Sequence, residues 1–166
     1  MKYLVSLIVI FGLFFTHQCT AQSIDKDAIP GQYVFKSLTY DHPVDLNKDG
    51  KSSRQFEAEM DACAIDMRYE LNADGSGKYT VGQQEKNCKN KQERAIKWKI
   101  KTGKLKGSGA DSAPKTYLVI SDADGFDPTP FEIVKQTKKG LIIRGEFRDD
   151  TDSTDSATLE LIKQKQ

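Results

Sequence analysis

The sequence is poor in histidine and has almost no excess charge, and each shortage argues against a class of function. Only two of the 166 residues are histidines, and His17 falls in an N-terminal segment that we expect to be removed. No recognisable motif places a nucleophile beside the other, His42, so a catalytic triad cannot be assigned. The 25 Lys and Arg nearly balance the 24 Asp and Glu, which is not typical of nucleic-acid-binding proteins. We therefore expect a protein that is not an enzyme and has no nucleic-acid partner.

The chain also lacks an apolar run long enough to span a bilayer. Its most apolar segment, Leu4 to Phe15, has about 12 residues, whereas a transmembrane helix needs about 20. Lys2 precedes the run, and small residues ending at Ala21 follow it, which is typical of a secretory signal peptide. We expect residues 1–21 to be the signal peptide. The mature chain would then have no transmembrane segment and would be exported, periplasmic or secreted, in a Gram-negative bacterium.

Cysteine is scarce as well, with three in the whole chain. Lipid attachment at Cys19 is the less favoured alternative, because Gln18 precedes it where bacterial lipoproteins have a small residue. Cleavage after Ala21 would leave only Cys63 and Cys88, and neither has a second Cys or a His at zinc-site spacing. In an oxidising compartment the pair predicts one disulfide that stabilises the fold by about 3 kcal/mol.

Alternation of apolar and polar residues predicts an all-β protein. It is clearest in residues 65–71, where Met67 and Tyr69 face one way while Arg68 and Glu70 face the other. The first strand starts at Gly31, and we expect Pro43 to end it. With it, eight short strands are predicted, the others being Ile65–Leu71, Lys78–Val81, Ile96–Lys101, Thr116–Ser121, Pro130–Gln136, Leu141–Phe147 and Ala157–Ile162.

Eight antiparallel strands are the number that closes a small up-and-down barrel. The links between them are short, which favours the barrel over two packed sheets. One short helix is expected after the first strand, over Arg54 to Ala62, with Ser52 or Ser53 as its N-cap. The organisation that follows is a loose lead-in over residues 22–30 and a single, monomeric barrel domain over residues 31–166. The segment from Gly103 to Pro114 is rich in Gly, Ser and Lys and is expected to be a loop.

Two sets of residues resemble a known family. Gly31-Gln32-Tyr33 resembles the Gly-x-Trp opening of the lipocalins, with Tyr in place of Trp. The order of Asp45-Leu46-Asn47-Lys48-Asp49-Gly50, a short helix, Cys63 and Tyr69-x-Leu71-Asn72-Ala73-Asp74-Gly75 resembles the exported lipocalin-like domain proteins of the Bacteroidetes. The resemblance covers Gly31 to Ile162 and implies a calycin-like β-barrel and an exported protein more than it implies an activity.

A possible calcium loop begins at Asp45. Oxygen ligands at alternate positions followed by glycine, as in Asp45-x-Asn47-x-Asp49-Gly50, form the first half of such a loop, and the backbone carbonyl of Lys51 would add a ligand. The twelfth position, which needs a carboxylate, is Phe56, and Glu57 comes one residue late. Calcium is therefore a possible cofactor held by Asp45, Asn47, Asp49, Lys51 and Glu57, and a solvated turn is the alternative.

The inner faces of the predicted strands carry large apolar side chains. We expect a small apolar or amphipathic molecule to bind at an open barrel end. The candidate contacts are Tyr33, Phe35, Met67, Tyr69, Trp98 and Ile143.

The alternative is a filled barrel whose basic face binds an anionic envelope component, a glycan or another protein. Between Lys86 and Lys106 the chain has nine basic residues and one acid, whereas Glu146 to Glu160 has six acids and one base. Lys97, Lys99 and Lys101 would form a row on one strand face.

Overall fold

Nine β-strands contain most of the residues that the structure describes. The computed structural model describes residues 23–84, 86–89, 91–104, 113–125, 127–148 and 154–165, so the expected signal peptide lies outside the described residues. In chain order the elements are η1 (Lys26–Ala28), β1 (Gly31–Val44), β2 (Ser53–Gln55), α1 (Phe56–Glu59), α2 (Ala62–Ile65), β3 (Met67–Leu71), β4 (Ser76–Val81), β5 (Gln92–Gly103), β6 (Lys115–Asp122), β7 (Thr129–Thr137), β8 (Gly140–Arg148) and β9 (Thr154–Lys163).

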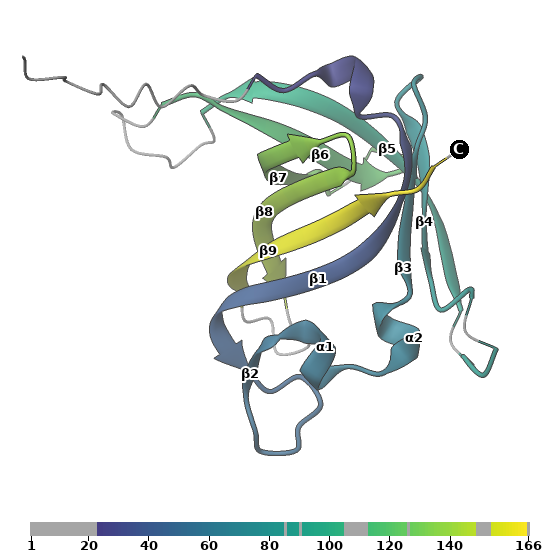
Figure 1. Cartoon of the computed structure of the whole chain (residues 1–166), viewed down its shortest axis with the longest axis vertical. Helices are drawn as coiled ribbons and strands as arrows, with labels where there is room; N and C mark the ends of the chain where they lie inside the picture. Colours follow the sequence, from purple (N-terminus) through teal and green to yellow (C-terminus); the bar gives the residue numbers. More distant parts are fainter. Residues whose placement is uncertain are drawn as a thin grey trace, which may run out of the picture.

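The strands form one antiparallel sheet that closes on itself (Figure 1). β1 closes it, because its first residues, Gly31 to Val34, pair with β3 while Tyr33 to Tyr40 pair with β9. The barrel therefore consists of β1 and β3–β9, and β2 is a three-residue addition beside β1. The prediction of an eight-stranded antiparallel up-and-down barrel is confirmed.

The barrel interior is an apolar core. Strand alternation directs every second side chain inward, and cross-strand partners such as Leu141 and Leu161, or Ile143 and Leu159, are both almost completely buried. The core also takes in Ile29, which precedes the first strand and has no exposed surface.

The connection between β1 and β3 differs from the prediction. In place of one helix over Arg54 to Ala62 there are two single-turn helices, α1 and α2, separated by Met60 and Asp61. Neither predicted serine caps a helix: α1 follows Gln55 without a side-chain cap, and the Asp61 carboxylate caps α2 by accepting a hydrogen bond from the Ala64 backbone N–H. Asp61 is a strong N-cap residue, so it starts a new helix where a continuous one was expected.

Two strand ends were also predicted wrongly. β1 continues through Pro43 to Val44, because this part of the strand has only a sparse pairing with β2, Val44 with Ser53, and a proline is tolerated at such an edge. Ile65 ends α2, so the predicted strand Ile65–Leu71 begins two residues later, at Met67. Most of the predicted Gly103 to Pro114 loop lies outside the described residues. None of the helices in the described ranges is long and apolar enough to cross a membrane.

Candidate functional site

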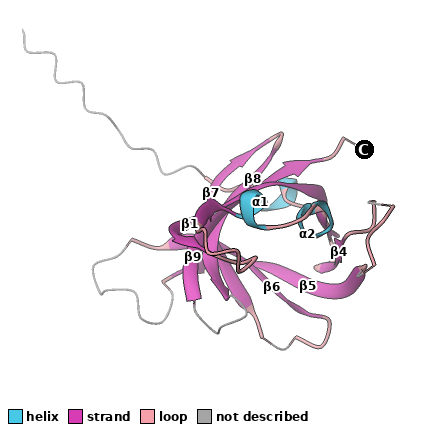
Figure 2. Ribbon diagram, turned by 90° about the horizontal axis from the view of Figure 1, so that it is seen from below, coloured by secondary structure: helices cyan, strands magenta, loops and turns pink. Residues whose placement is uncertain are grey.

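The two ends of the barrel are built differently. We call the end with the β3–β4 and β7–β8 turns the upper end, and the end with α1, α2 and the loop before β2 the lower end (Figure 1). Seen from below, α1 and α2 lie on the side of the lower end away from β5 and β6 (Figure 2).

The upper end is closed by the lead-in, which is folded and not loose as expected. The Asp25 backbone N–H donates to Gln136 Oε1 at 2.8 Å, and Gln136 Nε2 donates to the Asp25 carbonyl oxygen at 2.7 Å. These bonds tie the lead-in to β7. η1 then delivers Ile29 into the core, where the Tyr33 hydroxyl donates to the Ile29 carbonyl oxygen.

Lys163 of β9 makes a second connection to the lead-in at the upper end. Its Nζ donates to the Ala28 carbonyl oxygen at 2.7 Å and lies 5.7 Å from the centre of the Tyr33 ring. Burial of Tyr33 raises the pKa of its hydroxyl to about 12. Tyr33 of the opening motif therefore closes the interior at the upper end. The lead-in contacts it on one side and Lys163 of the last strand on the other.

The lower half of the interior is lined by aromatic side chains that keep part of their surface exposed. Phe35 of β1 packs edge-on against Phe56 of α1, with ring centres 5.9 Å apart. On the neighbouring strands, the rings of Tyr69 and Tyr79 lie 4.9 Å apart. The fifth ring, Phe147, lies 5.6 Å from the buried Phe131. We call Phe35, Phe56, Tyr69, Tyr79 and Phe147 the mouth aromatics; all five pack on the core and are only half-buried.

Two of the mouth aromatics, Tyr69 and Tyr79, carry ionisable hydroxyl groups. Burial raises the pKa values of both Tyr69 and Tyr79, so both hydroxyls are neutral and can donate or accept a hydrogen bond at neutral pH. Arg94 is the cross-strand partner of Tyr79 and is exposed; its charge acts against the effect of burial on the Tyr79 pKa. Arg94 forms no ion pair within the described part of the chain.

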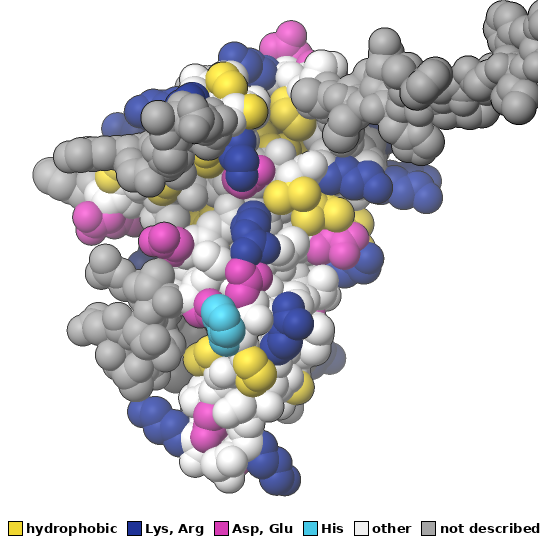
Figure 3. Space-filling view, turned by 90° about the vertical axis from the view of Figure 1, so that its left-hand side faces the viewer, with side chains coloured by type: hydrophobic (Ala, Val, Ile, Leu, Met, Phe, Trp, Pro, Cys, Tyr) yellow, Lys and Arg dark blue, Asp and Glu magenta, His cyan; other side chains and the backbone are white. Residues whose placement is uncertain are grey.

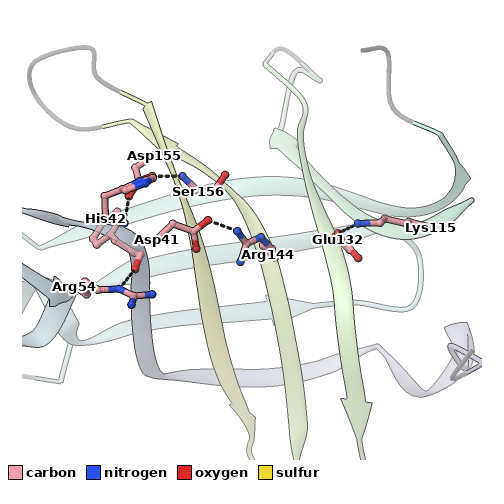
Figure 4. Close-up of polar contacts among 9 residues, drawn as sticks. Asp41, His42, Arg54, Lys115, Glu132, Arg144, Asp155 and Ser156 are labelled. Atoms are coloured by element: carbon pink, nitrogen blue, oxygen red, sulfur yellow. Dashed lines mark hydrogen bonds and ion pairs between the residues drawn. The ribbon is translucent and has the colours of Figure 1, made fainter. Parts of the chain in front are cut away.

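A histidine and an aspartate meet at the end of β1. The backbone N–H of His42 donates to Asp155 Oδ2 and the His42 ring Nδ1 lies 3.0 Å from Asp155 Oδ1 (Figure 4). These hydrogen bonds lower the pKa of Asp155. This pair could not be predicted from local sequence, because the two residues are 113 positions apart and meet only when β1 and β9 close the barrel.

Ion pairs run across the outer face next to this histidine. Arg144 on β8 pairs with Asp41 on β1, Glu132 faces Arg144 across the β7–β8 register, and Lys115 Nζ lies 2.7 Å from Glu132 (Figure 4). A view of one side of the molecule shows basic and acidic side chains mixed together (Figure 3). Acidic and basic side chains that alternate in this way can pair with one another.

Comparison with known proteins identifies the fold family. The model of the lipocalin-like domain family matches residues 29–141. The chain belongs to the lipocalin-like domain family. The resemblance noted in the sequence is thereby confirmed for the family, while the bacterial source and the export stay predictions.

One solved structure is similar to the lipocalin-like chain, a complex of bovine odorant-binding protein with a selenium-containing odorant. The alignment has a TM-score of 0.44 and 10% identity, and it covers 87% of this chain and 76% of that one. No curated protein matches the sequence.

The six predicted ligand contacts of the lipocalin-like barrel do not all lie together. Phe35 and Tyr69 are mouth aromatics, and Met67 is half-buried two residues before Tyr69 on the same strand face. Tyr33 and Ile143 each expose 1% of their surface and belong to the solid core. Trp98 lies beside the β3–β4 turn of the upper end, where its indole Nε1 donates to the Asn72 carbonyl oxygen at 2.9 Å. Phe56, Tyr79 and Phe147 were not predicted.

The predicted calcium loop has a shape that its own hydrogen bonds maintain. Asp45 accepts from the backbone N–H groups of Asp49 and Gly50, Asn47 Oδ1 also accepts from Asp49, and Asp49 accepts from Lys51. Glu57 Oε2 is buried without a hydrogen-bond partner among the described residues. Within those residues no three His, Cys, Asp or Glu side chains converge as a metal site. Calcium stays a prediction.

The predicted disulfide is present. Cys63 of α2 and Cys88 are bonded, with their Cα atoms 5.6 Å apart. The bond ties the helices of the lower end to the segment that links β4 and β5. Gly82 makes room for it: this residue is buried at φ 69°, and a side-chain carbon there would lie 3.3 Å from Cys88 Cβ.

A recess of about 680 Å³ lies outside the upper end, between the lead-in, the β7–β8 turn and the end of the chain. Its wall includes Lys138, Lys163 and Lys165, together with Asp25. None of the predicted ligand contacts lines it. The buried residues Ile29 and Tyr33 lie between this recess and the interior.

Proposed function

We propose that this lipocalin-like protein is an exported, non-enzymatic carrier that holds a small apolar or amphipathic molecule at its lower end. The observation that carries the proposal is the difference between the two ends. Toward the upper end the interior is packed solid around Tyr33, Leu71 and Leu141, each no more than 2% exposed. Toward the lower end five aromatic rings remain half-buried. Partly exposed rings still have apolar surface that a ligand can cover.

The surroundings of the mouth aromatics favour a ligand with an apolar body and a polar or acidic head. The Tyr69 and Tyr79 hydroxyls are neutral at physiological pH, and Arg94 lies next to Tyr79 with no carboxylate paired to it among the described residues. A guanidinium in this position can hold a carboxylate through two hydrogen bonds. Arg94 is therefore the proposed anchor for the head of an amphipathic acid.

Fluorescence titration tests the site. N-phenyl-1-naphthylamine is a neutral apolar probe, and 11-(dansylamino)undecanoic acid is an acidic amphipathic one. We expect both to bind the wild type and both to lose at least tenfold in affinity in Tyr79→Lys, because the substitution places a charge among the aromatic rings. Arg94→Gln should weaken only the acidic probe, by about tenfold. Val134→Lys is the control, because Val134 is apolar but 49% exposed.

A melting curve and far-ultraviolet circular dichroism establish that each variant is folded. Equal affinity of wild type and folded Tyr79→Lys for both probes would contradict the proposed site. Native mass spectrometry of the wild type needs no variant: a bound small molecule after purification from the native host supports the proposal. A chain with no bound species that also fails to bind either probe overturns it.

A further inference from the structure

The outer face of β5 carries a row of unpaired lysines that the proposed ligand site does not use. Lys97, Lys99 and Lys101, hereafter the lysine row, alternate along the strand and are all exposed. None of the three side chains forms an ion pair or hydrogen bond with another residue in the described part of the chain. Residues two apart on one strand face are separated by roughly 7 Å, so the row is a line of three positive charges about 14 Å long.

The neighbouring strands do not neutralise this line. The register partners of the lysine row on β6 are Ser121, Val119 and Tyr117, none of which is charged. On the other side, Lys97 faces Ser76, and β4 begins there, so Lys99 and Lys101 have no β4 partner. The sheet therefore supplies no acid in register with any of the three.

Other lysines nearby are neutralised, which makes the row distinct. Lys78 on β4 pairs with Glu93 at 3.1 Å, and Lys115 on β6 pairs with Glu132 at 2.7 Å. The outer face around Arg144 likewise alternates acid and base. Among the lysines of β4, β5 and β6, those without an ion pair to a described residue are therefore the three of the lysine row.

The row rests on an apolar base. Val119 and Tyr117, opposite Lys99 and Lys101, point to the outer face yet expose only 6% and 7% of their surface. Aliphatic stems of lysines cover such apolar surface while their ammonium groups stay in water.

We propose that the lysine row binds a linear anionic polysaccharide, one that carries carboxylate or sulfate groups along its length. The line of positive charges on β5 is complementary to a polysaccharide chain that carries negative charges at regular intervals. The aromatic side chain on this face, Tyr117, is buried and cannot stack on bases or on neutral sugars. The large hydrophobic residues exposed in the described chain, Val134 and Ile162, lie on β7 and β9 and could not anchor this face in a lipid bilayer.

The test measures binding of the full mature chain to dextran sulfate, with uncharged dextran as the reference, by titration at several salt concentrations. We expect the wild type to bind dextran sulfate and not dextran. The triple variant Lys97→Gln, Lys99→Gln and Lys101→Gln should lose at least tenfold in affinity at 50 mM salt. Its logarithmic salt dependence should be shallower by about two, because fewer counterions are released.

The matched control removes the same charge from another face. Lys135, Lys138 and Lys139 are exposed and form no ion pair with described residues, so their triple replacement by Gln should change the affinity less than twofold. Equal losses in the two triple variants would overturn the proposal, because net charge alone would then govern binding. So would binding to vesicles with 30% phosphatidylglycerol without binding to dextran sulfate, which would assign the row to a lipid surface. Failure to bind either would also overturn the proposal; the lysines would then only discourage another chain from pairing with the part of β5 that has no β4 partner.

Discussion

Tyr33 stands where the lipocalin opening motif has tryptophan. Its hydroxyl group makes a hydrogen bond that a purely apolar side chain could not make. It donates to the Ile29 carbonyl oxygen and so fixes the lead-in to the first strand. Its ring lies under the Lys163 ammonium group. Tyr33 thus connects the lead-in, β1 and β9.

We predict that Tyr33→Phe lowers the free energy of unfolding by about 1 kcal/mol at pH 8, the usual contribution of one hydrogen bond. The pKa of Tyr33 is raised from 10.0 to about 12 by burial. The unfolded chain therefore loses this proton from about pH 10 while the folded chain keeps it. This difference makes the wild type lose roughly 3 kcal/mol of stability between pH 10 and 12. The variant lacks that contribution.

Urea unfolding of both proteins between pH 8 and 12 measures this effect. The advantage of the wild type should shrink as the pH rises above 10 and reverse before pH 12, because the predicted loss is larger than the contribution of the hydrogen bond. A difference between wild type and variant that stays constant from pH 8 to 12 would contradict the assigned role of the hydroxyl.

At the residue scale the sequence predicted side chains with local signals and missed those that depend on closure of the barrel. Cys63 and Cys88 could be paired because no other cysteine follows the expected signal peptide. The partner of His42 could not be found, since Asp155 reaches it only through the β1–β9 pairing. Phe56 was assigned to the expected short helix and to the twelfth position of the possible calcium loop, but its packing on Phe35 was not predicted.

At the scale of elements, the strands followed from alternation while the connections did not. Period-two patterns predicted all eight barrel strands within a few residues. The segment between β1 and β3 carries weaker local preferences, and its two single-turn helices are held by tertiary contacts and by the Asp61 cap. Helices this short have little stability of their own, so sequence propensity is a poor guide to them.

The β8–β9 pairing depends on a close approach at Gly140. A side-chain carbon at this position would overlap the carbonyl oxygen of Leu161 on β9. We predict that Gly140→Ala lowers the free energy of unfolding by about 2 to 4 kcal/mol, because the two strands must separate locally.

Gly103 provides the control for this prediction. Its φ of 158° is nearly that of Gly140, 159°, but a side-chain carbon there would meet nothing within 4 Å. Gly103→Ala should change stability by no more than about 0.5 kcal/mol in the same urea experiment. Equal effects of the two substitutions would show that backbone preference and not strand packing is responsible.

The disulfide joins α2 to the segment after β4 across a sequence separation of 25. Replacing both Cys63 and Cys88 by alanine should lower the free energy of unfolding by about 3 kcal/mol, because the unfolded chain gains freedom. Reduced wild type should unfold at the same urea concentration as the double variant. An unchanged midpoint in both would mean that the bond adds no stability.

At the scale of the whole molecule, the barrel could be predicted by counting strands, but the difference between its ends could not. Eight alternating strands specify closure. Which end is filled depends on Ile29, which lies in a polar segment without a strand pattern, and on a hydrogen bond to Tyr33. For the same reason the set of predicted ligand contacts combined residues of the buried core, such as Ile143, with residues of the lower end, such as Tyr69.

The most direct test of the account is a chemical-shift map of the isotope-labelled protein titrated with N-phenyl-1-naphthylamine. We predict that saturation shifts the amide and aromatic signals of the mouth aromatics. The signals of the closed upper end, including Tyr33 and Lys163, should stay in place. Shifts confined to the lead-in and the recess beside Lys138 and Lys165 would contradict the account, and so would the absence of any shift.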